Sequence, residues 1–141
     1  MTPASQNLDA NNLYGWAMSL PLPIRGFKWK SELPTEEEIL GMKEKTKKGC
    51  ILEVDLEYPA ELHEEHNSHP LAPEKKAVKK EWMSDYQKGL MKDLDLKPLD
   101  SKKLLLTLHD KKNYVVHYRN LQFYLKQGMK LKRVHRVLEF E

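Results

Sequence analysis

The chain has 141 residues, 40% of them hydrophobic and 32% charged, with a formal net charge of +3 at pH 7. This length permits one domain with a modest core, and the composition favours a soluble α+β domain. The single cysteine, Cys50, excludes an internal disulfide and a metal site built from cysteines. No apolar stretch reaches the roughly 20 residues of a membrane span. The first seven residues also lack the character of a signal peptide, so we expect no membrane association, no secretion and a cytoplasmic or nuclear location.

The first third of the chain predicts a strand end and two helices. Residues 8–10 are typical of a short strand end, and residues 11–19 predict a turn that enters a helix, which Pro21 and Pro23 end. Residues 35–38, Thr-Glu-Glu-Glu, form a capping box in which a threonine hydroxyl and a glutamate satisfy free backbone amides. We therefore expect a second helix over residues 36–46.

The rest of the chain alternates between strand and helix patterns. Residues 50–58 alternate apolar and polar side chains, which predicts a strand with one polar face. A loop is expected over residues 67–80 and a helix over 81–91. Two strands are then expected over 103–108 and 114–117, a helix over 120–127 that Gly128 caps, and a final strand over 131–140.

The most informative segment is Asp9-Ala10-Asn11-Asn12-Leu13-Tyr14-Gly15-Trp16, followed by Pro21-Leu22-Pro23. It resembles motif A of family B DNA polymerases, written D-x-x-S-L-Y-P, and is most similar to the protein-primed branch of viruses, linear plasmids and self-synthesising transposons. Asn12 stands where the family often has serine, and Gly15 where it often has proline. Residues 21–27, 49–59, 67–74 and 114–141 resemble the palm of that branch in the same order.

The resemblance implies an α+β fold, a partial polymerase palm with the insertion that follows motif A. It assigns residues 1–141 to one partial DNA polymerase palm domain with four segments. These are an irregular N-terminus (1–7), the motif A region (8–27), an insertion-like segment (28–131) and a return strand (132–141). In the family, the insertion helps to hold the terminal protein and DNA.

The resemblance also implies the site. Asp9 is the catalytic carboxylate and binds Mg²⁺, which neutralises the triphosphate and activates the primer hydroxyl. Asn12, Leu13 and Tyr14 bind the nucleotide: the backbone of Leu13 contacts the phosphates, and Tyr14 packs under the sugar and excludes a 2′-hydroxyl. The implied partners are a DNA primer-template, deoxynucleoside triphosphates and a terminal priming protein.

Two segments partly match other polymerase motifs. Asn-x-Leu-Tyr-Gly also occurs in motif B, but that motif needs a lysine four residues before its asparagine, where this chain has Leu8 or Asn7. Asp93 and Asp95 have the spacing of the motif C acids, yet no apolar strand precedes them, so we interpret them as a helix end or loop. Without motifs B and C, the isolated chain is expected to be inactive, and a non-catalytic remnant or module that binds DNA or a priming protein is the alternative function.

The remaining candidates are charged or aromatic clusters. Lysines 75, 76, 79 and 80 form one basic run. A second run consists of Lys126, Lys130, Lys132, Arg133 and Arg136. Each run is a possible contact for a polyanion, or equally a solvated face, and the second is a possible contact for nucleic acid or the terminal protein. Tyr118, Tyr124 and Phe123 lie among basic residues and are candidates for base stacking, although core packing is favoured for Tyr124. His63, His66 and His69 have a spacing that suggests zinc, but Pro70 breaks the geometry and a polar surface segment is favoured.

Overall fold

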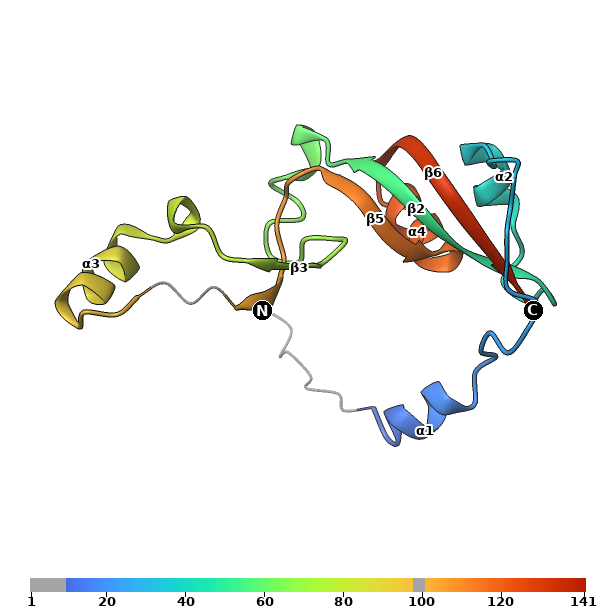
Figure 1. The fold of residues 1–141 in the computed structure, drawn as a ribbon, viewed down its shortest axis with the longest axis horizontal. Helices are drawn as coiled ribbons and strands as arrows, with labels where there is room; N and C mark the ends of the chain where they lie inside the picture. Colours follow the sequence, from blue (N-terminus) through green and yellow to red (C-terminus); the bar gives the residue numbers. More distant parts are fainter. Residues whose placement is uncertain (1–9, 98–100) are drawn as a thin grey trace, which may run out of the picture.

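The computed structural model of the chain describes residues 10–97 and 101–141. They form a mixed α+β structure with a four-stranded antiparallel sheet in the order β1-β6-β2-β5 and a separate two-stranded sheet, β3-β4 (Figure 1). The mixed α+β class predicted from the sequence is therefore confirmed. None of the helices described is long and apolar enough to cross a membrane.

The four-stranded sheet is built around β2 (Gly49–Glu57), which pairs antiparallel with β5 (Lys111–His117) and with β6 (Lys130–Phe140). Leu52 of β2 lies opposite Val116 of β5 and Val137 of β6, and all three side chains are buried. The short strand β1 (Lys28–Trp29) extends the sheet on the other side of β6. The alternation of β2 was predicted correctly, because every second side chain faces the core.

Two helices cover one face of this sheet. α4 (Tyr118–Lys126) contributes Leu121 and Leu125 to the core, and α2 (Glu36–Gly41) contributes Ile39. The buried Gln122 amide of α4 donates to the carbonyls of Ile39 and Met42, at 2.8 Å each. The Ile39 carbonyl also accepts from the Met42 amide at 3.2 Å, so the Gln122 side chain adds hydrogen bonds at the C-terminal end of α2, where helix carbonyls lack intrahelical partners.

The predicted capping box is present at the start of α2. Thr35 Oγ1 accepts from the Glu38 amide at 3.3 Å, and the Glu38 carboxylate accepts from the Thr35 amide at 2.9 Å. The predicted extension of this helix to residue 46 is wrong, since Met42 has an extended backbone conformation. The carbonyl bonds from Gln122, which the sequence does not reveal, stabilise this early end.

A hairpin with an inserted helix projects from the sheet domain, and we call it the arm (residues 74–97 and 101–105; Figure 1). Its strands, β3 (Glu74–Ala77) and β4 (Lys102–Leu105), pair antiparallel. Between them lie a 3₁₀ turn, η2 (Lys80–Trp82), and α3 (Asp85–Asp93). The prediction of a loop over 67–80 therefore missed β3. The predicted helix start at residue 81 is also wrong, because Met83 is extended and Ser84 caps α3 together with Gln87.

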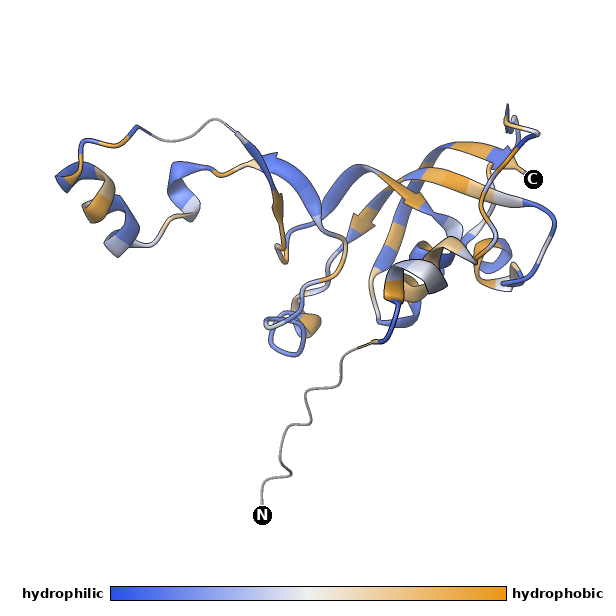
Figure 2. Ribbon diagram, turned by 90° about the horizontal axis from the view of Figure 1, so that it is seen from below, coloured by the Kyte–Doolittle hydropathy of each residue, from blue (hydrophilic) through white to orange (hydrophobic). Residues whose placement is uncertain are grey.

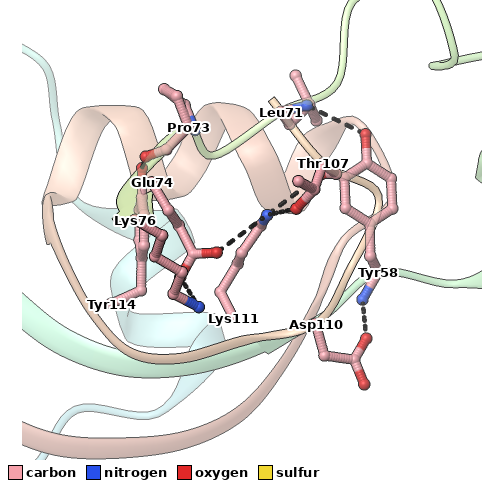
Figure 3. A network of polar contacts seen from close by, with 9 residues as sticks. All are labelled: Tyr58, Leu71, Pro73, Glu74, Lys76, Thr107, Asp110, Lys111 and Tyr114. Atoms are coloured by element: carbon pink, nitrogen blue, oxygen red, sulfur yellow. Dashed lines mark hydrogen bonds and ion pairs between the residues drawn. The ribbon is translucent and has the colours of Figure 1, made fainter. Parts of the chain in front are cut away.

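A buried lysine joins the arm to the sheet (Figure 3). The Lys111 ammonium lies 2.9 Å from Thr107 Oγ1, 3.2 Å from the Thr107 carbonyl and 3.5 Å from Glu74 Oε2. Burial lowers the pKa of Lys111, and the Glu74 carboxylate partly offsets that effect. Since Glu74 begins β3 and Thr107 follows β4, this one side chain holds both strands at the base of the arm.

The other helices and strands predicted from residue 11 onward overlap observed elements, whereas β1 and a 3₁₀ turn after β2 were not predicted. The first helix is α1 (Leu13–Met18), within the predicted range 11–19. The helix predicted over 120–127 is α4, which begins two residues earlier, and Gly128 follows it with a φ of 107°. A 3₁₀ turn, η1 (Ala60–Leu62), follows β2.

Candidate functional site

The motif A segment begins outside the described residues, because the structure starts at residue 10 and Asp9 precedes it. Residues 8 and 9 of the expected strand end are outside as well. Asn12 has the left-handed backbone conformation, with φ 54°, and directly precedes α1. Its side chain lies against Gly15, where an added Cβ would be 2.4 Å from Asn12 Nδ2. A residue larger than glycine at position 15 would therefore displace the Asn12 side chain.

The side chains predicted to bind the nucleotide are exposed. No residue of α1 is buried, and 85% of Tyr14 and 54% of Leu13 are open to solvent. Trp16 and Met18 of the same helix are exposed too. The segment thus presents an aromatic and apolar surface that the described part of the chain leaves uncovered.

The motif A region is attached to the opposite end of the sequence. The Ile24 amide donates to the Glu141 carbonyl at 2.9 Å, and the Glu141 amide donates to the Arg25 carbonyl at 2.8 Å. An ion pair of 3.2 Å between Arg25 and Glu141 joins the side chains. Next along the chain, Trp29 of β1 lies opposite Leu138 of β6. The predicted motif A region and the predicted return strand therefore lie side by side, although more than 100 residues separate them.

The second pair of acids lies elsewhere. Asp93 is the last residue of α3, and Asp95 follows it with a φ of 49°. The interpretation of this pair as a helix end is confirmed. α3 and α1 are well apart in both views (Figures 1 and 2). Within residues 10–97 and 101–141, no group of three or more His, Cys, Asp or Glu side chains is placed to hold a metal ion.

Two members of the predicted basic cluster form ion pairs with acidic side chains of β2, and three do not. On β6, Lys132 pairs with Glu57 and Arg136 pairs with Glu53, while the Arg136 guanidinium lies over the Trp29 ring at 5.2 Å from its centre. Three exposed members form no ion pair with any residue that the structure describes: Lys126, Lys130 and Arg133. The charge available to a polyanion is therefore smaller than the sequence suggests.

The acidic partners lie on the face of β2 that the helices do not cover. Asn113, with φ 51°, donates its backbone amide to Asp55 and its side-chain amide to Glu53, each at 2.8 Å. These hydrogen bonds are the main reason why the pKa of each carboxyl is lowered, with Arg136 adding to the effect on Glu53 and His135 to that on Asp55. Asn113 was not among the residues predicted from the sequence. The available signal was an asparagine, a residue that tolerates positive φ, near the start of a strand.

His135 lies beside the same carboxylates. Its Nε2 is 2.8 Å from Asp55 Oδ1, an ion pair by distance when the ring is protonated. The ring nitrogen is buried and lacks hydrogen-bond alignment with any partner, so we count the contact as electrostatic only. This face of the sheet is a network of opposite charges rather than a basic surface.

Two of the other histidines surround one tyrosine. His63 Nε2 is 3.1 Å from the Tyr58 carbonyl, and His66 Nδ1 is 2.8 Å from the Tyr58 hydroxyl, which also accepts from the Leu71 amide. These imidazoles hold the segment after β2 against a buried tyrosine. The expectation of a merely polar surface missed this packing role.

The remaining single residues divide into buried and exposed ones. Cys50 is buried, and burial raises the pKa of its thiol to about 11, which disfavours the reactive thiolate. Tyr118 is 3% exposed, so its candidate role in base stacking is wrong. Tyr124 packs against the core as favoured, and Phe123 is half exposed and accessible for stacking.

No protein-family model, curated protein or solved structure matches the chain. The resemblance to family B polymerases therefore rests on the motif and the segments that follow it.

Proposed function

We propose that the chain is a palm segment of a protein-primed family B DNA polymerase, whose complete form extends DNA by two-metal deoxynucleotidyl transfer. The observation that carries the proposal is the motif from Asp9 to Tyr14, followed in family order by the segments that end at residue 141. The isolated chain would be inactive, because motifs B and C are absent from it.

Two structural observations support this proposal. Backbone hydrogen bonds between residues 24–25 and Glu141 join the motif A region to the return strand. This is the arrangement expected when residues 28–131 are inserted into a palm, because an insertion must leave and re-enter its host at one place. Tyr14 is also exposed at the start of α1, where its ring is available to a sugar.

The proposed roles follow the motif. In the complete enzyme Asp9 would hold Mg²⁺, the ion that neutralises the triphosphate and activates the primer hydroxyl. Asn12, Leu13 and Tyr14 would bind the deoxynucleoside triphosphate, with Tyr14 below the sugar. The substrates are a DNA primer-template and deoxynucleoside triphosphates, and a terminal protein supplies the priming hydroxyl.

The experiment is a primer extension assay with Asp9→Asn in a complete polymerase that carries this segment. Extension should fall by several orders of magnitude, because a metal ligand loses its charge while its size is kept. Asp93→Asn, at the end of α3, is the matched control and should retain activity. Normal extension by Asp9→Asn would refute the motif assignment.

The alternative function is a non-catalytic module that binds DNA or a priming protein. The exposed cations of Lys126, Lys130 and Arg133, which form no ion pair with the described residues, favour it. DNA binding by the 141-residue chain, combined with full extension by the complete Asp9→Asn protein, would support this alternative over the polymerase role.

A further inference from the structure

The arm contains an apolar groove between α3 and the strands. It has a volume of about 460 Å³, and its apolar lining includes Val78, Met83, Leu90, Met91 and Leu96. A second hollow of about 260 Å³ continues it and shares Met83, Met91 and Leu96. Methionine side chains are flexible and polarisable, so such a lining adapts to apolar side chains of different shapes.

The helix beside the groove is not packed against the rest of the described chain. α3 has nine residues, and none of them is buried. Figure 2 shows apolar residues alternating with polar ones along this helix, which stands apart from the four-stranded sheet. Isolated helices of this length are marginal in water, and most helices gain their stability by packing an apolar face. The apolar face of α3 therefore has packing capacity that the described residues do not use.

The rim of the groove is basic. Lys97 and Lys103 line the first hollow, and Lys80, Lys88 and Lys92 line the second, against the single acid Asp95. Lys88 pairs with Asp85, whereas the other four lysines form no ion pair with the described residues. A ligand for this groove thus needs apolar side chains for the floor and negative charges for the rim.

We propose that the arm groove binds an amphipathic, acidic helix of a partner protein. The apolar face of that helix, with side chains spaced i, i+3, i+4 and i+7, would contact Leu90, Met91 and Leu96. Its carboxylates would face the lysine rim, in the helix-in-groove mode of recognition. Removal of apolar surface from water supplies the affinity, and the lysines select an acidic partner over a basic one.

A peptide fits the groove better than a nucleic acid does. Bases need flat aromatic surfaces on which to stack, and the groove is lined by aliphatic and thioether side chains instead. The exposed aromatic residue of α3, Tyr86, does not line either hollow. The proposal does not depend on the roles of Asp9 and Tyr14, because it rests on the groove of the arm alone.

The test is fluorescence anisotropy with the complete 141-residue chain. The probe is a labelled peptide of about 18 residues, long enough for roughly 27 Å of helix, with leucines on one face and glutamates elsewhere. Saturable binding is expected, with at least tenfold weaker binding by a Leu90→Asp/Met91→Asp variant. A peptide of the same composition without a continuous apolar face should bind at least tenfold more weakly, as should one with lysine in place of glutamate.

Matched variants separate the groove from general effects of charge. Tyr86→Asp/Leu94→Asp adds the same two negative charges at exposed residues of α3 and its C-terminal end that line neither hollow, so it should retain binding. Lys92→Glu should weaken binding at least fivefold, whereas Lys47→Glu, on an exposed loop of the sheet domain, should not. Because no residue of α3 is buried, circular dichroism should show an intact fold in each variant.

Two results would overturn the proposal. One is equal peptide affinity for the wild type and the Leu90→Asp/Met91→Asp variant. The other is preferential binding of a labelled oligonucleotide that Lys92→Glu abolishes and Leu90→Asp/Met91→Asp leaves unchanged. The second result would make the arm a nucleic-acid contact.

Discussion

The ammonium of Lys111 on β5 lies 3.5 Å from the carboxylate of Glu74, the first residue of β3, and the lysine side chain is fully buried. A buried charge is costly unless it is paired and hydrogen-bonded, and here Glu74 and Thr107 meet both needs. Tyr114 donates to the Pro73 carbonyl beside this pair, at 3.0 Å. The base of the arm is therefore held by polar contacts to β5 (Figure 3).

Removal of the Glu74 carboxylate should lower the free energy of unfolding more than removal of the Lys111 ammonium. Glu74→Gln leaves the Lys111 ammonium buried without a counter-charge, so the free energy of unfolding should fall by about 3 kcal/mol. Lys111→Met removes the buried charge and leaves Glu74 paired with Lys76 at 3.0 Å, so the loss should stay within about 1 kcal/mol. Urea denaturation at pH 7 measures both. A larger loss for Lys111→Met would show that the ammonium itself stabilises the fold.

The buried Lys111–Glu74 pair also predicts that the stability of the fold depends on pH. Because the pKa of Lys111 is lowered in the folded state, the unfolded chain binds more protons between that pKa and the ordinary value of about 10.4. The stability of the wild type relative to Lys111→Met should therefore rise as the pH increases through this window. Denaturation curves at pH 7 and at about pH 10.4, the upper end of this window, measure the difference, and an unchanged difference would contradict the lowered pKa.

Replacement by alanine should destabilise the structure at Gly128 and favour the helix at Gly89. Gly128 has φ 107°, and a Cβ there would lie 2.9 Å from Leu62 Cδ1, so Gly128→Ala should destabilise the domain by about 1–2 kcal/mol. Gly89 is inside α3 with nothing near its missing Cβ, so Gly89→Ala should increase helix content. Thermal unfolding and far-ultraviolet circular dichroism measure the two effects. An equal midpoint for Gly128→Ala and the wild type would show that the turn relaxes without cost.

Asn113 should protect the sheet against acid. Its bonds hold the pKa values of Glu53 and Asp55 below their usual range, so this stabilisation is present above pH of about 4 and is lost as the pH falls through the folded-state values. Asn113→Gly removes the side-chain bond to Glu53 and keeps the positive φ, and acid unfolding should begin at a higher pH. Asn113→Ala should lose about 1 kcal/mol more at neutral pH because of backbone strain. Identical acid-unfolding midpoints for the wild type and Asn113→Gly would rule out this role.

Local patterns in the sequence predicted the local structure well. The capping box at Thr35 and the alternation of Cys50, Leu52 and Val54 act within one element, so the sequence contains all the information needed. The early end of α2 depends on Gln122, which lies 83 residues from Ile39 in the sequence, and no periodicity reveals such a contact.

The same distinction explains the errors in the candidate site. The sequence shows five cations near residue 130, but the ion pairs of Lys132 and Arg136 with β2 depend on strand pairing. β3 was missed because its side chains, Glu-Lys-Lys-Ala, have weak strand propensity, and its pairing with β4 is what defines it. Tyr118 was a candidate for base stacking because it lies among basic residues in the sequence, but the fold buries it in the core.

Exposed and paired cations should differ in their contribution to DNA binding. Each phosphate contact adds about 0.7–0.9 to the slope of log affinity against log salt. Lys126→Ala/Lys130→Ala should lower that slope by the amount expected for the loss of one to two phosphate contacts, because these cations form no ion pair with the described residues. Lys132→Met/Glu57→Gln removes a matched pair of charges and should leave the slope unchanged. Titration of labelled primer-template DNA between low and physiological salt measures both, and equal slopes throughout would mean that this cluster is a solvated face.

Tyr14 gives the sharpest test of the proposed nucleotide site. In a complete polymerase that carries this segment, Tyr14→Val should retain deoxynucleotide incorporation within about tenfold and increase ribonucleotide incorporation, since it removes the ring that we propose excludes a 2′-hydroxyl. Single-nucleotide extension with each substrate, in separate reactions, measures the ratio of the two. Tyr86→Val is the matched control, because Tyr86 is 78% exposed on the arm and Tyr14 is 85% exposed on α1. The ratio should change only for Tyr14→Val. If both activities fell together without a gain in ribonucleotide use, Tyr14 would be a packing residue of the complete enzyme and not its sugar gate.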